Sequence, residues 1–288
     1  MTTRFRKAAR PEKAACEDFP VMKIFQIDAF ASEVFRGNPA AVVPLDAWLP
    51  DARMQAIAAE NNLAETAFFV PTKDGYHLRW FTPSQEVPLC GHATLASAFV
   101  IFAEIDAIEV VRFQTQSGLL TVRRSGEMLQ MDFPRYVLAP VEAPPALLTG
   151  LRLPPREVFK TLAHSQDQAA TEIDYYAVYD TEAEVRALAP DFPALSRLDL
   201  LGVVVTAPGD GVDFVSRYFA PRLGIPEDPV TGSIHCALVP YWAARLGRRT
   251  LRARQVSQRG GDLFCEVTEN RVLIAGSAVK YLEGEIFI

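Results

Sequence analysis

The sequence predicts an α+β protein made of two pseudo-symmetric halves, and three observations support this fold class. One motif occurs twice, about half the chain apart. Segments with the alternating or β-rich pattern of strands outnumber the apolar segments of helical length. The 288 residues are 49% apolar and 22% charged, a balance that lets a globular protein bury a full core without disulfides.

The repeated motif combines an aromatic, strand-like segment, a proline-containing loop and the start of a helix. Its first copy, residues 79–93, reads RWFTPSQEVPLCGHA, and its second copy, residues 217–234, reads RYFAPRLGIPEDPVTGSI. Pro229 follows Pro88 by 141 residues, about half of 288. One such match could arise by chance, but the whole order is unlikely to recur by chance. We therefore expect two halves with the same arrangement of strands around one helix each.

The first half is expected to hold seven strands and two helices. The strand segments are Met22–Ala29, Ala40–Pro44, Ala67–Pro71, His77–Phe81, Val110–Thr115, Gly118–Arg123 and Met128–Phe133. Asp51–Asn61 is expected to be a helix because Met54, Ile57 and Ala58 recur at helical spacing, with Asp51 as its N-cap. Cys90–Phe102 is expected to be a second, strongly apolar helix.

The second half repeats this style after Ala139–Pro155, a Pro- and Leu-rich stretch without periodicity that we interpret as the crossing between halves. Its expected strands are Asp174–Tyr179, Leu201–Thr206, Phe214–Phe219, Arg252–Ser257, Asp262–Thr268, Arg271–Gly276 and Ala278–Phe287. Its expected helices are Ala183–Leu188 and the long, buried Ser233–Leu246. The chain thus divides into a loose extension (1–21), a first lobe (22–137) and a second lobe (138–279).

Charge and cysteine content exclude several classes of protein. The formal net charge of −6 and a pI near 5.4 argue against nucleic acid as the main partner. No two of the four cysteines are at C-x-x-C spacing, which favours free thiols in the cytoplasm. No apolar run is long enough to span a membrane. One basic cluster is interpreted as solvated surface rather than an anion site: Arg245, Arg248, Arg249, Arg252 and Arg254.

Residues 1–21 carry several basic side chains but no apolar core, so they do not have the pattern of a secretory signal. We interpret them as a loose extension or a consequence of start-codon choice, with a transit peptide as the alternative.

The two copies of the motif place similar triplets at two helix starts: Cys90-Gly91-His92 and Thr231-Gly232-Ser233. The first N–H groups of a helix have no internal acceptor, and the aligned peptide dipoles add about half a positive charge there. A glycine lets a ligand approach the backbone closely. Two such starts facing each other across a cleft would hold a small carboxylate. The alternative is two ordinary helix caps, with Ser233 capping its own helix.

Glu65 is the strongest candidate for an acid–base residue. It follows a turn and enters an apolar run that contains Phe68, Phe69 and Val70. Burial raises the pKa of a carboxyl group, and a carboxyl group with a raised pKa can accept and return protons near neutral pH. The alternative is a cap or a solvent-exposed side chain.

These residues lie in motifs that resemble those of the PhzF-like (phenazine biosynthesis) isomerase family, within the diaminopimelate-epimerase-like superfamily. The matching blocks are IDAF (27–30), GNP (37–39), NNLAETAFF (61–69), PLCGHAT (88–94), EDPVTGS (227–233), SQRGG (257–261) and AGSA (275–278). They occur in order from about Met22 to the end of the chain, and the set is specific although each block alone is weak.

The resemblance implies two pseudo-symmetric, diaminopimelate-epimerase-like lobes, each a curled β-sheet around a central helix, with the strand near 280–288 joining the first lobe. It implies a homodimeric isomerase that needs no metal or organic cofactor and acts on a small carboxylate-containing substrate. Glu65 would transfer a proton, with His92 and Asp228 assisting. Gly91, Gly232 and Ser233 would line the pocket, together with Cys90 and Thr231 at the same helix starts.

The second helix start departs from the wider superfamily, in which epimerases and proline racemases have a cysteine at each start. Here Cys90 is matched by Thr231, and Cys236 lies five residues further on, inside the helix. A hydroxyl is a far poorer base than a thiol, so we expect a single carboxylate, Glu65, to remove a proton beside a carboxylate and return it to another carbon. The substrate would be a small acid, cyclic or open-chain, and closure of the lobes would exclude water.

Two other functions remain as alternatives, and three more are disfavoured. A Cys90–His92 hydrolase is disfavoured because residues two apart on a helix do not face each other. A metal site is disfavoured because His77, His92, His164 and His235 are not spaced like metal ligands. Nucleotide binding is disfavoured because the sequence contains no nucleotide-binding glycine motif. An amino-acid racemase or epimerase stays open. So does a catalytically silent binding or scaffold protein, because fold alone does not fix function.

Overall fold

The computed structural model describes residues 21–162 and 174–288. Apart from Val21, the expected N-terminal extension lies outside these residues, and so does His164. The helices are α1 (Asp51–Asn61), α2 (Gly91–Val100), α3 (Pro145–Leu151), α4 (Glu182–Ala187), α5 (Phe192–Leu195) and α6 (His235–Leu246). A π-helical turn, Ile101–Ile105, follows α2, and a 3₁₀ turn spans Pro221–Leu223. No helix in the described parts of the chain is long and apolar enough to cross a bilayer.

Strands make up most of both lobes. The first-lobe strands are β1 (Val21–Ala29), β2 (Asn38–Pro44), β3 (Glu65–Thr72), β4 (Gly75–Phe81), β5 (Glu86–Val87), β6 (Val110–Thr115), β7 (Gly118–Ser125) and β8 (Met128–Pro134). The later strands are β9 (Val137–Pro140), β10 (Glu157–Leu162), β11 (Asp174–Val178), β12 (Gly202–Pro208), β13 (Phe214–Ala220), β14 (Ile225–Asp228), β15 (Thr250–Gln255), β16 (Gly261–Val267), β17 (Arg271–Gly276) and β18 (Ala278–Phe287).

The strand pairings repeat between the lobes. β2 and β3 are parallel, β3 pairs antiparallel with β4, and β4 pairs antiparallel with β5 and parallel with β6. β11 to β15 reproduce this pattern, and antiparallel β6–β7–β8 corresponds to β15–β16–β17. The equivalent strands β8 and β17 pair antiparallel with each other, so one continuous ladder runs through both lobes. This arrangement has the two-lobed pseudo-symmetry expected from the sequence repeat.

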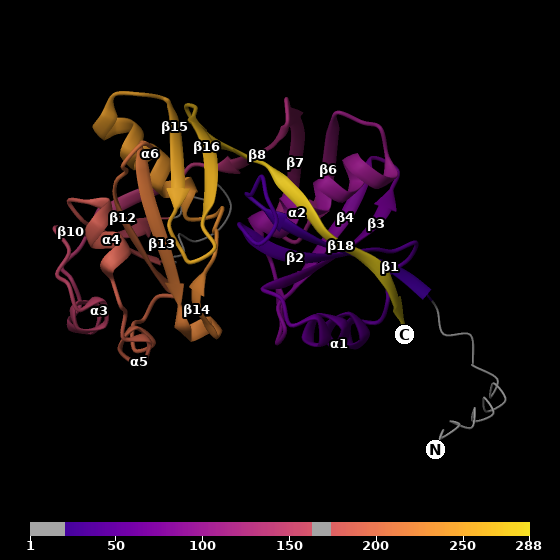
Figure 1. The fold of residues 1–288 in the computed structure, drawn as a ribbon, viewed down its shortest axis with the longest axis horizontal. Coiled ribbons are helices and arrows are strands. Elements are labelled where there is room, and N and C mark those ends of the chain that lie inside the picture. Colours follow the sequence, from indigo (N-terminus) through magenta and orange to yellow (C-terminus); the bar gives the residue numbers. More distant parts are fainter. Residues whose placement is uncertain (1–20, 163–173) are drawn as a thin grey trace, which may run out of the picture.

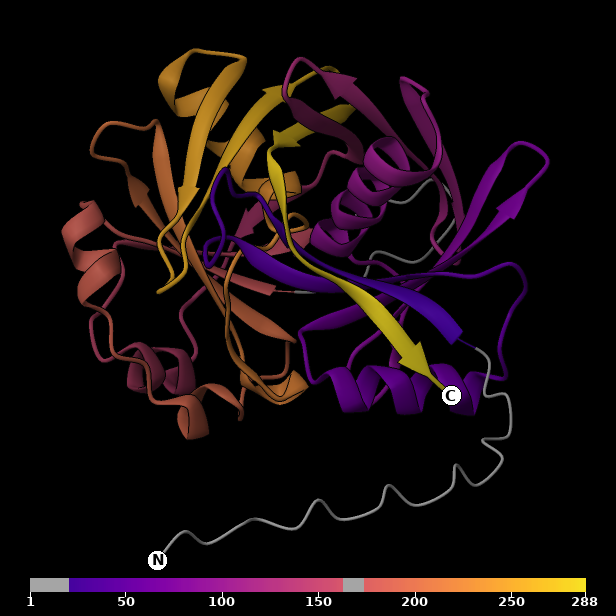
Figure 2. The ribbon, with the colours of Figure 1, turned by 45° about the vertical axis from the view of Figure 1, so that its right-hand side comes forward.

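The outer strand of each lobe comes from the end of the other half. β18 follows β17 in the chain but pairs antiparallel with β1, as the resemblance implied. β9 follows β8 but pairs antiparallel with β10. Figure 1 shows β18, in yellow, crossing from the second lobe to lie along β1 of the first, and Figure 2 shows the same strand in front of the first lobe. The two halves therefore exchange their trailing strands.

A buried helix fills the inside of each curled sheet. α2 is buried along nearly its whole length, as expected for a helix that is apolar on all sides. α6 contains Pro240, which cannot donate to the carbonyl of Cys236 one turn earlier. The N–H of Tyr136 donates to that carbonyl at 3.0 Å, so the segment that links the lobes is attached to α6. On the outside, α1 packs on β3, whereas α3, α4 and α5 cover a separate apolar core of the second lobe.

The structure corrects several expected boundaries. Pro50, not Asp51, is the N-cap of α1, and Asp51 is the first helical residue, where a negative charge suits the helix dipole. The crossing Ala139–Pro155 contains the end of β9 and all of α3, whose short length gives too few turns for a detectable period. α6 begins at His235 rather than Ser233, because residues 232–234 form a tighter turn with i to i+3 hydrogen bonds.

Candidate active site

Both lobes contribute to one cavity of about 460 Å³. All eight site residues expected from the sequence line it. These are Glu65, Cys90, Gly91, His92, Asp228, Thr231, Gly232 and Ser233. The cavity thus lies where the two copies of the repeated motif meet.

The two helix starts contact each other through their glycines. A Cβ atom added to Gly91 would lie 3.5 Å from the Cα of Gly232, and one added to Gly232 would lie 3.6 Å from the Cα of Gly91. Both distances are ordinary contacts, so an added methyl group would fit but would fill the space between the backbones. The first hydrogen bond of α2 runs from the N–H of Thr94 to the carbonyl of Cys90, so the Gly91 and His92 amides precede it.

The second helix start supplies a comparable set of amides. The N–H of His235 donates to the carbonyl of Gly232 at 3.1 Å, and the N–H groups of Gly232 and Ser233 precede this first bond. Ser233 makes no side-chain cap to α6, contrary to the capping alternative. Anions can bind at amide groups of this kind.

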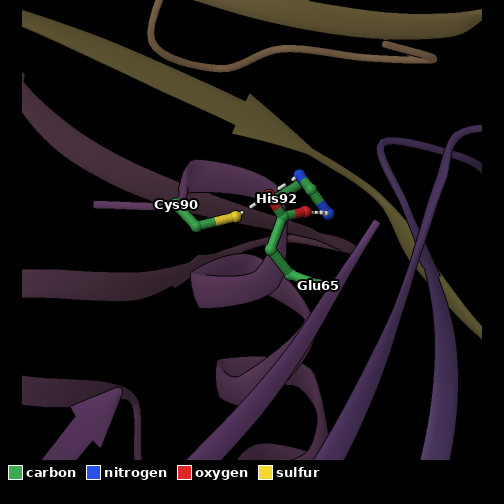
Figure 3. Close-up of side chains that lie close together, drawn as sticks. All are labelled: Glu65, Cys90 and His92. Carbon is green, nitrogen blue, oxygen red and sulfur yellow. Dashed lines mark hydrogen bonds and ion pairs between the residues drawn. The ribbon is translucent and has the colours of Figure 1, made fainter. Parts of the chain in front are cut away.

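Glu65 and His92 face each other inside the cavity. Glu65 is the first residue of β3 and His92 lies in the first turn of α2, and Figure 3 shows the carboxylate against the edge of the imidazole ring. Glu65 Oε2 lies 3.0 Å from His92 Nε2, and both side chains are buried. The two atoms are poorly aligned for a hydrogen bond, and neither has another partner among the described residues. Both atoms are themselves buried, so the contact between them is shielded from solvent.

Asn38 connects His92 to the second lobe, and the sequence analysis did not assign it a role. Its Nδ2 donates to Asp228 Oδ1 at 2.8 Å and to the carbonyl of Val230 at 2.9 Å, and it lies 3.1 Å from His92 Nδ1. The two acceptors use both protons of the Asn38 amide group. A proton on His92 Nδ1 would find no acceptor on this NH₂ group, so Nδ1 is better placed when it carries a lone pair. When the imidazole is neutral, this arrangement favours the tautomer with its proton on Nε2, the nitrogen on the side of Glu65.

Asp228 is held by three side chains. Asn38 donates to its Oδ1, and the Thr231 hydroxyl donates to its Oδ2. Gln255 donates to the Asp228 carbonyl at 2.7 Å and accepts from the Thr231 N–H at 2.8 Å. Gln255 also donates to the Thr231 hydroxyl at 3.2 Å, so that hydroxyl is fully engaged. Thr231 is thus a support for Asp228 and not a free base.

Burial dominates the protonation of this site. It raises the pKa of Asp228 to about 6, and it raises the pKa of the Cys90 thiol to about 11. Burial lowers the pKa of His92, whereas the negative charges of Cys90 and Glu65 raise it, and the net direction is upward. Because the Cys90 thiol is neutral at neutral pH, Glu65 is the charge that acts on His92 there.

Glu65, Cys90 and His92 lie close enough to suggest a metal site, a proximity that sequence spacing did not reveal. Their candidate ligand atoms lie within 4.8 Å of one another. Cys90 Sγ, however, lies 3.5 Å from Nδ1 of the imidazole, whereas Glu65 contacts Nε2. The sulfur and the carboxylate thus meet opposite ring nitrogens. This is the geometry of a chain of polar contacts rather than of ligands that converge on one ion.

The charges around the cavity are mainly negative. Its lining includes the carboxyl groups of Glu65, Asp174 and Asp228, but no lysine or arginine from the described parts of the chain. Three tyrosines, Tyr136, Tyr176 and Tyr218, also line it. A substrate carboxylate would therefore be bound by backbone amides and hydroxyl groups and not by a guanidinium group. Asp174 was not among the expected site residues, because no sequence motif marks it.

Comparisons with known proteins identify the family. The family described as "Phenazine biosynthesis-like protein" matches residues 27–284. A curated protein named an uncharacterized isomerase from Pseudomonas aeruginosa is 52% identical over 268 residues, which are 93% of this chain and 99% of that protein. A crystal structure of a PhzF-family phenazine biosynthesis protein from Enterococcus faecalis is 48% identical, with a TM-score of 0.87, and covers 93% of this chain and 100% of that one.

More distant structures share the fold. A hydroxyproline epimerase from Agrobacterium vitis has a TM-score of 0.60 at 14% identity and covers 93% of each chain. This likeness confirms the expected α+β, epimerase-like architecture with its large curled sheet. From the family match and the close relatives, the chain belongs to the phenazine biosynthesis-like (PhzC-PhzF) family and is an isomerase.

Proposed function

We propose that this isomerase moves a proton between carbon atoms of a small carboxylic acid, with Glu65 as the acid–base group and without a cofactor. The observation that carries the proposal is that Glu65 and two helix starts from different lobes line one cavity. A substrate carboxylate held between the starts would place its neighbouring carbon near a buried carboxylate.

The helix starts would bind the substrate carboxylate. The amides of Gly91, His92, Gly232 and Ser233 precede the first hydrogen bonds of their helices, and the helix dipoles favour negative charge there. The two glycines leave the backbones open to close approach. The same amides would stabilise the additional negative charge that develops when a proton leaves the adjacent carbon.

Glu65 would carry the proton. Its carboxylate takes a proton from a carbon beside the substrate carboxylate, and the electron pair of the C–H bond spreads into the carboxylate and any conjugated double bond. The protonated Glu65 then returns the proton to another carbon, so the product is an isomer and no oxidant or reductant is consumed. His92, with its proton on Nε2, would orient Glu65, and Asp228 would hold His92 through Asn38.

A two-base racemase is the competing function, and the second helix start argues against it. The Thr231 hydroxyl is engaged by Asp228 and Gln255, and the pKa of Cys90 is raised to about 11. Neither group is a ready base at neutral pH. A single carboxylate serving one face of the substrate accounts better for these contacts.

Solvent deuterium exchange tests the proposal. The protein is incubated in D₂O with a panel of small carboxylic acids and amino acids, and deuterium incorporation is followed by NMR. Glu65→Gln is expected to lower the exchange rate by about 10²–10⁴-fold, because the amide cannot take up the proton. Glu60→Gln, on the exposed face of α1, is the matched control and should exchange at the wild-type rate.

Substrate binding should survive in Glu65→Gln, because the helix starts are unchanged. Full exchange activity in this variant, with its fold intact by circular dichroism, would rule out Glu65 as the acid–base group. Exchange by neither the wild type nor the variant, together with unaltered partner binding, would favour the catalytically silent scaffold.

A further inference from the structure

The second lobe has no glutamate at the position equivalent to Glu65. The repeat aligns Phe81 with Phe219, and these residues pair with Thr66 and Val203 on the neighbouring strands. The residue before Thr66 is Glu65, and the residue before Val203 is Gly202. Gly202 is therefore the second-lobe equivalent of Glu65.

Tyr218 fills the space that a side chain at Gly202 would need. A Cβ atom on Gly202 would lie 2.5 Å from the Tyr218 hydroxyl oxygen and 2.5 Å from its ring, closer than atoms can pack. In the first lobe the equivalent of Tyr218 is Trp80, which is fully buried. The second lobe thus places a phenol in the cavity where the first lobe places a carboxylate.

The phenol holds a second carboxyl group in the cavity wall. Tyr218 donates to Asp174 Oδ1 at 2.9 Å, and Asp174 lies beside Gly202 in the parallel pair β11–β12. Asp174 is 5% exposed and Tyr218 is 8% exposed, and both line the cavity. Burial raises the pKa of Asp174 to about 6, and its contacts with Tyr218 and the Gly202 backbone lower it. At neutral pH Asp174 is therefore a largely ionised carboxylate in a poorly hydrated place.

We propose that Asp174, positioned by Tyr218, binds a protonated amine of the substrate on the second-lobe wall of the cavity. This inference rests on the proposed function, because it concerns the same substrate. No arginine or lysine lines the cavity in residues 21–162 and 174–288, so none of these residues offers Asp174 a lysine or arginine cation there. A substrate ammonium group would donate hydrogen bonds to Asp174 and compensate its buried negative charge, whereas a second carboxylate would be repelled.

A purely structural role for Asp174 predicts different behaviour. If Asp174 served only to anchor Tyr218, an asparagine could replace it, because a phenol both donates and accepts hydrogen bonds. Binding of amines would then be unchanged. The two roles are separated by the preference for an amino group and not by stability.

The test compares ligands that differ only in an amino group. Cyclohexanecarboxylate and its 2-, 3- and 4-amino derivatives are titrated against the protein by isothermal titration calorimetry. At least one amino derivative is expected to bind the wild type about tenfold more tightly than the parent acid, as for a hydrogen-bonded charged pair. Asp174→Asn is expected to bring this ratio to about one.

Further variants sharpen the result. Tyr218→Phe removes the hydroxyl that orients Asp174 and should lower the ratio only in part. Asp180→Asn, which removes an exposed second-lobe carboxylate, is the matched control and should keep the wild-type ratio. A wild type without preference for any amino derivative, or an unchanged ratio in Asp174→Asn, would overturn the proposal.

The same variants separate this inference from the proposed function. Glu65→Gln should keep the binding ratio while losing deuterium exchange. If exchange persists in Glu65→Gln but the ratio depends on Asp174, the acid–base assignment fails and the amine subsite stands. If exchange needs Glu65 but no amine preference exists, the subsite fails and the proposed function stands.

Discussion

The two lobes share a scaffold but differ where they meet the cavity. In each lobe an arginine at the start of the repeated motif makes a bidentate ion pair with a glutamate, and its guanidinium group lies over a phenylalanine ring. These sets are Arg79, Glu86 and Phe81 in the first lobe and Arg217, Glu227 and Phe219 in the second. In contrast, the positions of Glu65 and His92 in the first lobe are occupied by Gly202 and Ser233 in the second lobe. The repeat has thus kept the parts that hold the sheet together and changed the parts that face the cavity.

The difference divides the proposed chemistry between the lobes. The first lobe contributes the Glu65–His92 pair, and the second contributes Asp174 and Asp228, two carboxyl groups whose pKa burial raises to about 6. A substrate between the lobes would therefore meet a proton carrier on one side and groups that hold it on the other.

Among the variants that compare the two lobes, the largest effect is expected from replacing the equivalent residues His92 and Ser233 of the two helix starts. His92→Asn should lower the rate of deuterium exchange by about 10²–10³-fold, because Glu65 loses the imidazole that orients it. Ser233→Ala should cost less than about tenfold, because the second start binds through its backbone. The rates of deuterium exchange of both variants are measured on one substrate. Equal losses of rate would contradict the expected difference between the two helix starts.

Asp228 gives the second lobe a pH-dependent stability. Its pKa is raised from 3.8 to about 6, so between pH 4 and 6 the folded protein keeps a proton that the unfolded chain releases. The contribution of this carboxyl to stability is complete below about pH 4 and is lost as the pH rises through 6, a change of roughly 3 kcal/mol.

Urea unfolding at several pH values between 4 and 7 measures this change. Asp228→Asn should remove that part of the decline, whereas the exposed-residue variant Asp180→Asn should follow the wild type. A variant at position 228 with the wild-type slope would show that the group is not responsible.

The smallest expected effect concerns the paired arginines. Arg217 also donates to the carbonyls of Val185 and Leu188 near the end of α4, whereas the remaining hydrogen bond of Arg79 goes to the exposed Asp51. Replacement by lysine loses the two-fold geometry in both lobes. We expect Arg217→Lys to lower the free energy of unfolding by about 1–2 kcal/mol and Arg79→Lys by about half as much. Urea unfolding of the two variants side by side measures the difference, and an equal or larger loss in Arg79→Lys would show that the carbonyl contacts of Arg217 add no stability.

The sequence predicted those elements that carry a clear period. α1, β6, β17 and β18 have the expected bounds, because each combines regular apolar spacing with a marked end. β14 was missed because Gly224, Pro226 and Pro229 interrupt a segment that is too short to show alternation. β10 and α3 were missed because they lie in or next to a proline-rich crossing.

The candidate site was predictable only where a motif marked it. The two helix starts and Glu65 stand in recognisable blocks, and the structure brings them to one cavity. Asn38 and Gln255 act through contacts to Asp228 that are 190 and 27 residues apart in the chain, and such contacts leave no trace in a single sequence. Asp174 becomes visible only through the sheet register that places it beside Gly202.

Because the two halves exchange their trailing strands, neither half alone contains all the strands of its lobe. A fragment ending after β8 would leave the edge of β1 open, because the strand that covers it is encoded at the far end of the gene. A fragment beginning at β10 would likewise lack the β9 segment that covers its own edge. Two copies of one such half would satisfy both needs by reciprocal donation, so the single chain has the geometry of a strand-swapped pair.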